Sequence, residues 1–224
     1  MDKNRISMER ARESYSKGNF KDTIKLLKDF EKNRLDRYES LMLLGYSYFH
    51  LHKGKDAVRS FSEAISVSPG SKEAMLFLGK SYNMIGKRND AVKAFRDALK
   101  IDPDYKDALI NLGVTLAELA NQDEADEIFR HVTEKFPEEK RGWYNLGLVN
   151  FHKKNYAESE ASFKRALELE PEFTEALYNL AAVYCMTGNE ELFTECVEKI
   201  KEKNSKLAKI LISACKKEKR KLKW

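Results

Sequence analysis

The chain contains little proline and cysteine and lacks a long apolar run. Only four of its 224 residues are proline and three are cysteine. No run of about 18 apolar residues occurs, and the first residues, MDKNRISMER, contain no apolar core of a signal peptide. Cys185, Cys196 and Cys215 are odd in number and lack paired spacing. We therefore expect a soluble, cytoplasmic protein with reduced thiols and neither a disulfide framework nor a zinc site.

Residues that could support catalysis are also sparse. His50, His52, His131 and His152 are the only histidines, and they are not grouped as metal ligands. Cys185 has no histidine or lysine neighbour in the sequence that would mark it as an activated thiol. The sequence thus predicts a protein that is not an enzyme, with no cofactor, metal ion or small-molecule substrate.

The positive charge of the chain is concentrated at its C-terminal end. Lysine and arginine total 41, aspartate and glutamate total 36, and Lys216–Trp224 alone contains six basic residues and one acidic residue. The rest of the chain is balanced, with 35 residues of each sign. The isoelectric point of about 8.9 is therefore a property of this tail. It does not indicate a nucleic-acid-binding surface along the rest of the chain.

The prolines are placed with a strict period. Pro69, Pro103, Pro137 and Pro171 are separated by 34 residues in each case. The dipeptide Leu-Gly recurs at the same interval and becomes Leu-Ala in its last copy; its leucines are Leu44, Leu78, Leu112, Leu146 and Leu180. Because a helix cannot continue through proline, the period predicts a tandem array in which a helix ends before each proline.

The segment Lys72–Tyr105 shows the repeated unit most completely. Its first half has residues at i, i+3, i+4 and i+7 of one helical stripe, namely Met75, Leu78, Gly79 and Tyr82. After a turn at Gly86, the second half repeats helical spacing with Ala91, Phe95 and Ala98. The unit is predicted to be a hairpin of two helices. We expect Gly79 to allow their close approach and Ala91 to face it.

This pattern resembles the tetratricopeptide repeat, a 34-residue helical hairpin. The resemblance implies an all-α fold, a right-handed superhelical solenoid of antiparallel helix pairs closed by a C-terminal capping helix. It also implies a single domain over residues 4–207. Six copies follow one another without an insertion, at residues 4–37, 38–71, 72–105, 106–139, 140–173 and 174–207.

The two ends of the array depart from the pattern. The first repeat has Ser7, Arg10 and Ser14 where the pattern has larger apolar residues. This suits a terminal repeat with a polar outer face or, alternatively, a first helix that docks elsewhere. A capping helix is expected over residues 205–215, with Ser205 as its N-cap and an apolar stripe of Leu207, Ile210, Leu211 and Ala214.

Residues 216–224 form the basic tail, for which two interpretations stay open. Runs of like charge are commonly solvated ends of a chain. The same charge would also be attracted to an anionic membrane surface, and Leu222 and Trp224 would suit its interface. The tail is therefore either a solvated end or a peripheral membrane contact.

Function in this family is carried by a concave groove, lined by first-helix residues outside the packing stripe. Asn111, Asn145 and Asn179 share one position of the repeat, and a ladder of amides there would bind the main chain of an extended peptide. Asparagine is also simply frequent at that position. By its match to the repeat, the groove is expected to contain Met42, Leu43, Tyr46, Phe49, Phe77, Lys80, Asn111, Arg141, Tyr144, Asn145, Leu148, Phe151, Tyr178 and Asn179.

The resemblance implies a protein-protein interaction adaptor that binds a peptide or helix of a partner. Chaperone adaptors of this family hold a C-terminal carboxylate with five residues, of which this chain matches only Asn111, with Arg141 as a cationic substitute. An acidic chaperone tail is therefore not the expected partner. The alternative is a self-associating scaffold or a coat on an organelle membrane, as in magnetosome-type proteins. The neutral array argues against nucleic acid.

Overall fold

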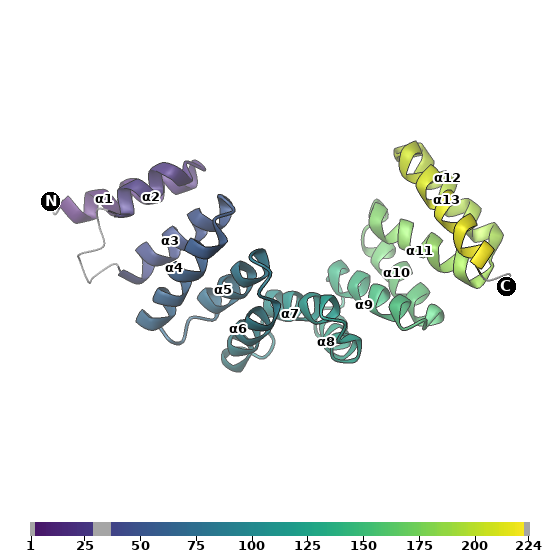
Figure 1. Cartoon of the computed structure of the whole chain (residues 1–224), viewed down its shortest axis with the longest axis horizontal. Coiled ribbons are helices and arrows are strands. Elements are labelled where there is room, and N and C mark those ends of the chain that lie inside the picture. Colours follow the sequence, from purple (N-terminus) through teal and green to yellow (C-terminus); the bar gives the residue numbers. More distant parts are fainter. Residues whose placement is uncertain (1–2, 29–36, 222–224) are drawn as a thin grey trace. The chain divides into compact units, whose positions relative to one another are not determined.

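The computed structural model describes residues 3–28 and 37–221 (Figure 1). Within these residues the chain forms thirteen α-helices and no strand, which confirms the predicted all-α class. Contacts divide the chain into two compact units, residues 1–115 and 116–224. We describe each unit by itself.

In the first unit, helices follow one another as antiparallel pairs. Helix α1 packs against α2 and α3, and each later helix packs against the next as far as α6. Met8 and Ala11 of α1 are buried, so this helix is held on its neighbours although its repeat departs from the pattern. The helices are α1 Lys3–Ser16, α2 Phe20–Lys28, α3 Arg37–His50, α4 Gly54–Val67, α5 Lys72–Met84, α6 Arg88–Ile101 and α7 Lys106–Glu118, which extends past the unit's boundary.

Close approach of paired helices depends on a glycine facing a phenylalanine ring. A methyl group added at Gly79 would lie 2.4 Å from Cε1 of Phe95, which is fully buried. The ring of Phe95 thus supplies the atoms nearest to Gly79, and the expectation that Ala91 also faces this glycine stays a prediction. The same contact joins Gly45 to Phe61 at 2.6 Å. Each ring thus fills the space that a missing side chain leaves.

The turn inside each hairpin contains one residue with a positive φ angle. After Tyr82, the N–H of Gly86 donates to the carbonyl of Asn83, and the N–H of Lys87 to that of Tyr82. This bonding satisfies carbonyls at the end of the helix and requires a left-handed residue. That residue recurs every 34 positions, as Gly18 (74°), His52 (56°), Gly86 (75°), Ala120 (59°), Lys154 (62°) and Gly188 (79°).

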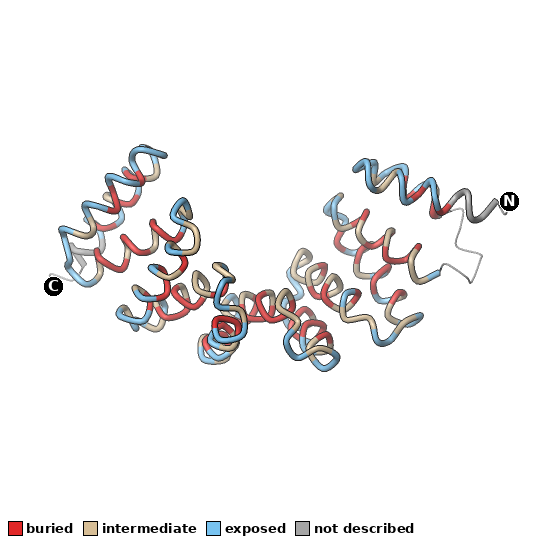
Figure 2. Tube along the Cα trace, turned by 180° about the vertical axis from the view of Figure 1, so that it is seen from behind, coloured by how far each residue is buried: buried red, intermediate tan, exposed pale blue. Residues whose placement is uncertain are grey.

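The second unit repeats this arrangement (Figure 2). Helix α8 packs against α9, α9 against α10, α10 against α11 and α11 against α12. Helices α8, α10 and α12 bury one stripe and expose the opposite side, whereas α9 and α11 are mostly buried or half-buried, as the tube coloured by burial shows. The helices are α8 Gln122–Lys135, α9 Lys140–His152, α10 Tyr156–Leu169, α11 Thr174–Thr187, α12 Glu190–Lys203 and α13 Ser205–Lys221.

A buried amide replaces the tyrosine of the repeat pattern at Asn150. Its Nδ2 donates to Asp126 Oδ1 at 3.0 Å and to the carbonyl of Leu146 at 3.1 Å, and its Oδ1 accepts from Asn155 Nδ2 at 3.2 Å. Asp126 in turn accepts from Arg130 Nε at 2.7 Å. The side chain of Asn150 is fully buried, yet both ends of its amide have partners, which removes the penalty of burying a polar group.

The structure contradicts the prediction of three reduced thiols. Cys185 of α11 and Cys215 of α13 form a disulfide, with their Cα atoms 5.8 Å apart, and only Cys196 is a free cysteine. The two cysteines lie 30 residues apart in the sequence, so no local spacing predicted the disulfide. Packing of α13 against α11 and α12 brings them together.

Helix α13 also differs from the predicted cap in its start and its rotation. Asn204 Oδ1 accepts from the N–H of Leu207 at 3.0 Å, so Asn204 performs the capping expected of Ser205, which is already helical. Leu211 is buried as predicted, whereas Ile210 and Ala214 are exposed and Ala208 and Cys215 face the core. The disulfide at Cys215 is consistent with this rotation. Within the described residues, no helix is long and apolar enough to cross a membrane.

Candidate peptide-binding surfaces

Six ring-bearing residues from the first two and a half repeats form an N-terminal aromatic cluster. Helix α1 and the start of α2 contribute two of them, α3 contributes three and α5 one. None of the six belongs to the fully buried core, and their rings contact one another across repeats. The cluster consists of Tyr15, Phe20, Tyr46, Phe49, His50 and Phe77.

The rings of this cluster meet mostly edge to face. The ring of Phe77 contacts the rings of Tyr46 and Phe49, at centroid distances of 4.6 Å and 5.8 Å. Both of these rings are nearly perpendicular to that of Phe77. Phe20 stacks on His50 at 4.6 Å with an interplanar angle of 7°. Tyr15 lies 5.5 Å from Phe20 and 6.1 Å from Tyr46. Such pairs are favourable, and they give a rigid surface that costs little entropy when a ligand binds.

Charged side chains frame the middle of the cluster. Tyr46 donates its hydroxyl hydrogen bond to Glu73 Oε1 at 2.5 Å. Burial, that hydrogen bond and the charge of Glu73 all raise the pKa of Tyr46 well above its ordinary value, so it stays a neutral donor. Lys80 lies over two rings, with its Nζ 4.6 Å from the centroid of Phe77 and 5.5 Å from that of Phe49. The surface therefore combines aromatic faces with one cation and one carboxylate.

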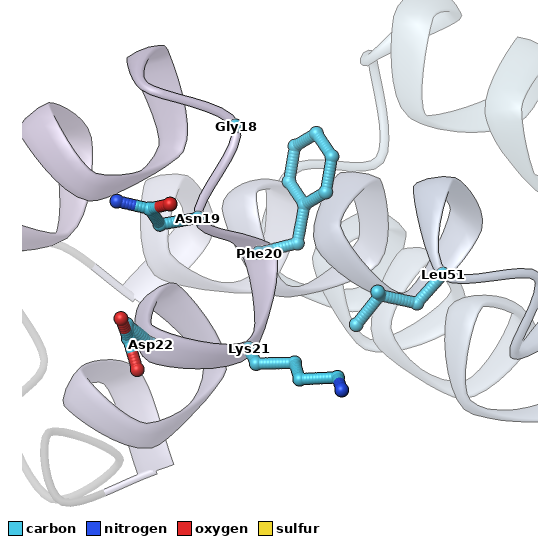
Figure 3. Close-up of a pocket in the computed structure, with 6 residues that line it drawn as sticks. All are labelled: Gly18, Asn19, Phe20, Lys21, Asp22 and Leu51. Carbon is cyan, nitrogen blue, oxygen red and sulfur yellow. The ribbon is translucent and has the colours of Figure 1, made fainter.

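A cavity of about 340 Å³ lies beside this cluster (Figure 3). Phe20 and Leu51 provide its apolar walls, one from the first repeat and one from the second. The side chains of Asn19 and Asp22 point away from the ring of Phe20 in the close-up, and Lys21 extends along the edge below Leu51. The cavity could receive a single apolar side chain of a partner.

A second group of groove residues, the C-terminal amide-aromatic cluster, lies in the second unit. Tyr144 contacts Phe173 at a centroid distance of 4.9 Å, and Phe151 contacts Tyr156 at 5.7 Å. The aromatic and leucine members are half-buried and pack on the edge of the hydrophobic core. The cluster is made of the predicted residues Tyr144, Asn145, Leu148, Phe151, Tyr178 and Asn179.

The asparagine side chains in this cluster use one end for internal bonds. Nδ2 of Asn145 donates to the carbonyl of Arg141 at 2.8 Å, and Nδ2 of Asn179 donates to that of Glu175 at 2.8 Å and to the hydroxyl of Tyr144 at 3.1 Å. Among the described residues, no group donates to either Oδ1 atom. Each amide is thus held in place with its acceptor available to a ligand.

The remaining predicted groove residues, Met42, Leu43, Asn111 and Arg141, differ in how far they are buried and in which groups they contact. Met42 is only 5% exposed and belongs to the core of the first unit, whereas Leu43 is half-buried at its edge. Asn111 donates from Nδ2 to the carbonyl of Asp107 at 2.6 Å, as the other two asparagines do on their own helices. Arg141 is exposed and forms an ion pair with Glu139 at 2.9 Å.

Two members of the N-terminal cluster, Tyr15 and Phe20, were not predicted. Tyr15 lies in the last turn of the first helix of the least typical repeat. Phe20 begins the second helix, which the groove pattern does not include. The signal available in the sequence was that Tyr15 precedes Phe49 by 34 residues. This correspondence places Tyr15 at a groove position of the first repeat.

The described residues offer few reactive groups. No three histidine, cysteine or acidic side chains in the described ranges are grouped so that they could hold a metal ion. The free thiol of Cys196 is buried, which raises its pKa to about 11, so it is protonated and a poor nucleophile at neutral pH. The groups displayed by the two clusters are aromatic faces, amide oxygens and single charges.

These features define a helical-repeat protein with aromatic and amide surfaces on its first helices. Four tetratricopeptide repeat models match the sequence, at residues 51–105, 85–146, 141–173 and 162–192. The chain belongs to the tetratricopeptide repeat family. A search of curated protein sequences found no match.

Solved structures agree with this assignment. A crystal structure of MamA is 27% identical, with a TM-score of 0.69, and the match covers 77% of this chain and 96% of that one. A tetratricopeptide repeat protein from Parabacteroides merdae has a TM-score of 0.82 at 19% identity, with coverage of 97% and 87%. PilW, a type IV pilus biogenesis factor, has a TM-score of 0.79 at 16% identity, with coverage of 95% and 100%. The last two show the fold alone.

Proposed function

We propose that this protein is a non-catalytic interaction module that binds an extended peptide segment of a partner protein. The observation that carries the proposal is the pair of asparagines, Asn145 and Asn179, whose amides are anchored through Nδ2 and leave Oδ1 available. A peptide in extended conformation presents main-chain N–H groups whatever its sequence, and an amide oxygen accepts from them.

The aromatic neighbours of these amides support the same function. Tyr144 and Phe151 are half-buried beside Asn145, on the surface that the family uses for ligands. Rigid rings supply contact area for the side chains of a bound peptide at little entropic cost. Main-chain recognition by amides and side-chain recognition by rings together suit a peptide or a helix end better than a small molecule or a nucleic acid.

The experiment selects peptides from a displayed random library against the full chain and measures their affinity for three variants. Asn145→Ala with Asn179→Ala removes two acceptors and is expected to weaken binding about tenfold or more, since each hydrogen bond contributes about 1 kcal/mol. Tyr144→Ala alone is also expected to weaken peptide binding relative to the unchanged chain, because an aromatic contact is lost. Asn89→Ala changes an exposed asparagine at the start of α6 and serves as the matched control.

Circular dichroism and urea unfolding of each variant show whether the fold is retained. Binding that the double asparagine variant and Tyr144→Ala leave at the level of Asn89→Ala would contradict the proposal. So would a selection that enriches no peptide. Retained folding with binding lost only in the two surface variants would support it.

A second candidate function, self-association, is favoured by the cavity beside the first repeat. Phe20 and Leu51 form an apolar hollow there that a side chain of a second copy could enter. Light scattering over a wide concentration range would then show assembly by the full chain and loss of assembly in Leu51→Glu. A monomer at all concentrations would reject this alternative and leave the surfaces for a foreign peptide.

A further inference from the structure

The outer face of helix α13 carries a set of lysines around one isoleucine. Ala208, Leu211 and Cys215 face the core, at 2%, 2% and 6% exposure. The opposite side is exposed and includes an isoleucine that is 50% exposed. We call this side the α13 outer face and define it by Lys206, Lys209, Ile210, Lys216 and Lys217.

These four lysines differ from their neighbours in having no acidic partner. On the adjacent helix, Lys201 pairs with Glu198 at 3.0 Å and Lys203 pairs with Glu172. Within the part of the chain that the structure describes, none of the lysines of the α13 outer face forms an ion pair or a hydrogen bond. Helix α13 contains a single acidic residue, Glu218, which is followed by Lys219, Arg220 and Lys221. The helix therefore presents uncompensated positive charge.

The exposed isoleucine favours an anionic bilayer over a nucleic acid as the partner of this face. Ile210 lies one residue from Lys209 and four from Lys206, so an aliphatic side chain projects among the charges. Lysines also bind the phosphates of a nucleic acid, but base recognition and base stacking use guanidinium, amide or aromatic groups, and the described side chains of this face include none. A bilayer with anionic headgroups satisfies both features, because lysines reach the phosphates while the aliphatic group enters the acyl boundary.

Two contacts keep this face directed outward. The disulfide between Cys215 and Cys185 ties the helix to α11 immediately before Lys216. Ala208 and Leu211 pack into the core of the second unit at the other end of the helix. By contrast, α12 exposes Glu190, Glu191, Glu195 and Glu198, which would be repelled by an anionic bilayer. Of these two helices, only α13 would therefore be attracted to such a bilayer.

We propose that the α13 outer face docks on the surface of an anionic lipid bilayer. This interaction goes beyond peptide binding and uses no residue of either cluster. A basic residue close to an anionic bilayer strengthens partitioning about fivefold. The attraction is screened by salt, so binding is strongest at low ionic strength.

The test measures co-sedimentation of the full, oxidised chain with large vesicles of phosphatidylcholine, with and without phosphatidylserine. We expect binding only to the vesicles that contain phosphatidylserine. Replacing Lys206, Lys209 and Lys217 by glutamine should lower the partition coefficient on the order of 100-fold. Ile210→Ser should lower it about fivefold, because the aliphatic contact is lost while all charges remain.

A matched control separates this face from the overall charge. Replacing Lys25, Lys55 and Lys87 by glutamine removes the same charge from exposed positions in the first unit and should leave vesicle binding unchanged. Equal losses in both triple variants would overturn the proposal, because net charge alone would then explain the binding. Asn145→Ala with Asn179→Ala should also bind vesicles normally, so failure of the peptide-binding proposal is separately visible.

Two other results would overturn the proposal. In the first, the protein does not bind vesicles at low salt but binds a single-stranded RNA oligonucleotide, and Ile210→Ser does not weaken the RNA binding. This result would assign the face to nucleic acid. In the second, light scattering detects a salt-sensitive oligomer, and the variant with Lys206, Lys209 and Lys217 replaced by glutamine is a monomer. In that case the acidic face of α12 in a second copy is the partner.

Discussion

Reciprocal substitution at two turns gives a quantitative test of how the hairpins close. Gly86 has φ of 75°, and a methyl group built there meets no atom within 4 Å. Ala120 occupies the equivalent turn with φ of 59° and is exposed. Because Gly86→Ala meets open space, its only cost is the backbone conformation. An L-residue in this region is less stable than glycine by about 1–2 kcal/mol, from which the greater freedom of unfolded glycine subtracts about 0.5–1 kcal/mol.

We therefore expect Gly86→Ala to lower the free energy of unfolding by about 1 kcal/mol and Ala120→Gly to raise it by about 0.5–1 kcal/mol. Urea unfolding followed by far-ultraviolet circular dichroism measures both, with unchanged denaturant slopes as the sign that only stability has changed. The double variant should be close to the parent, since substitutions in separate turns add. A stabilising Gly86→Ala or a destabilising Ala120→Gly would show that the positive φ angle does not determine the stability of these turns.

Three further outcomes follow from buried groups. Ser47 Oγ is buried without a partner among the described residues, whereas Ser81, one repeat later, donates to a main-chain oxygen at 2.7 Å; in urea unfolding Ser47→Ala should gain about 1 kcal/mol and Ser81→Ala should lose about 1 kcal/mol. Gly79→Ala should lose about 1–2 kcal/mol by the same measurement, because the clash with Phe95 outweighs the better helix propensity of alanine. In mass spectrometry without reductant, iodoacetamide should modify no cysteine of the native protein and only Cys196 after unfolding; three modified thiols would contradict the disulfide.

Features that depend on local pattern could be predicted from the sequence. The 34-residue period of the prolines and Leu-Gly pairs predicted the helical hairpins, and the stripe from Met75 to Tyr82 lies inside α5 as expected. A turn at Gly86 was also expected, and the structure has it there with a positive φ angle. His52 and Lys154 adopt the same conformation without being glycine, so for them the repeat position carries the information and the side chain does not.

Features that depend on tertiary packing could not be predicted. The disulfide requires α13 to rotate so that Cys215 meets Cys185, and a stripe of alternative apolar residues around Ile210 gave the wrong rotation. The packing at Gly142 is a second such feature. In the structure, a methyl group there would lie 2.7 Å from Cγ1 of Val132, so the glycine allows α8 and α9 to approach.

The candidate surfaces follow the same division. Residues such as Tyr46 and Asn145 could be assigned from their position in the repeat. The orientation of an amide could not, because the internal bond of Nδ2 that leaves Oδ1 available is a property of the folded helix. The contribution of Tyr15 likewise depends on how α1 packs against α3.

The disulfide between α11 and α13 gives the array an order in which it can unravel. In a stack of repeats the end units have one neighbour fewer, so opening usually begins at an end. At the C-terminal end, peeling α13 away is blocked while Cys185 and Cys215 stay joined. The first repeat has no such covalent tie in its described residues. Under strain or heat the oxidised protein should therefore lose its hairpins from the N-terminal side first, and the C-terminal amide-aromatic cluster would be the last to lose its support.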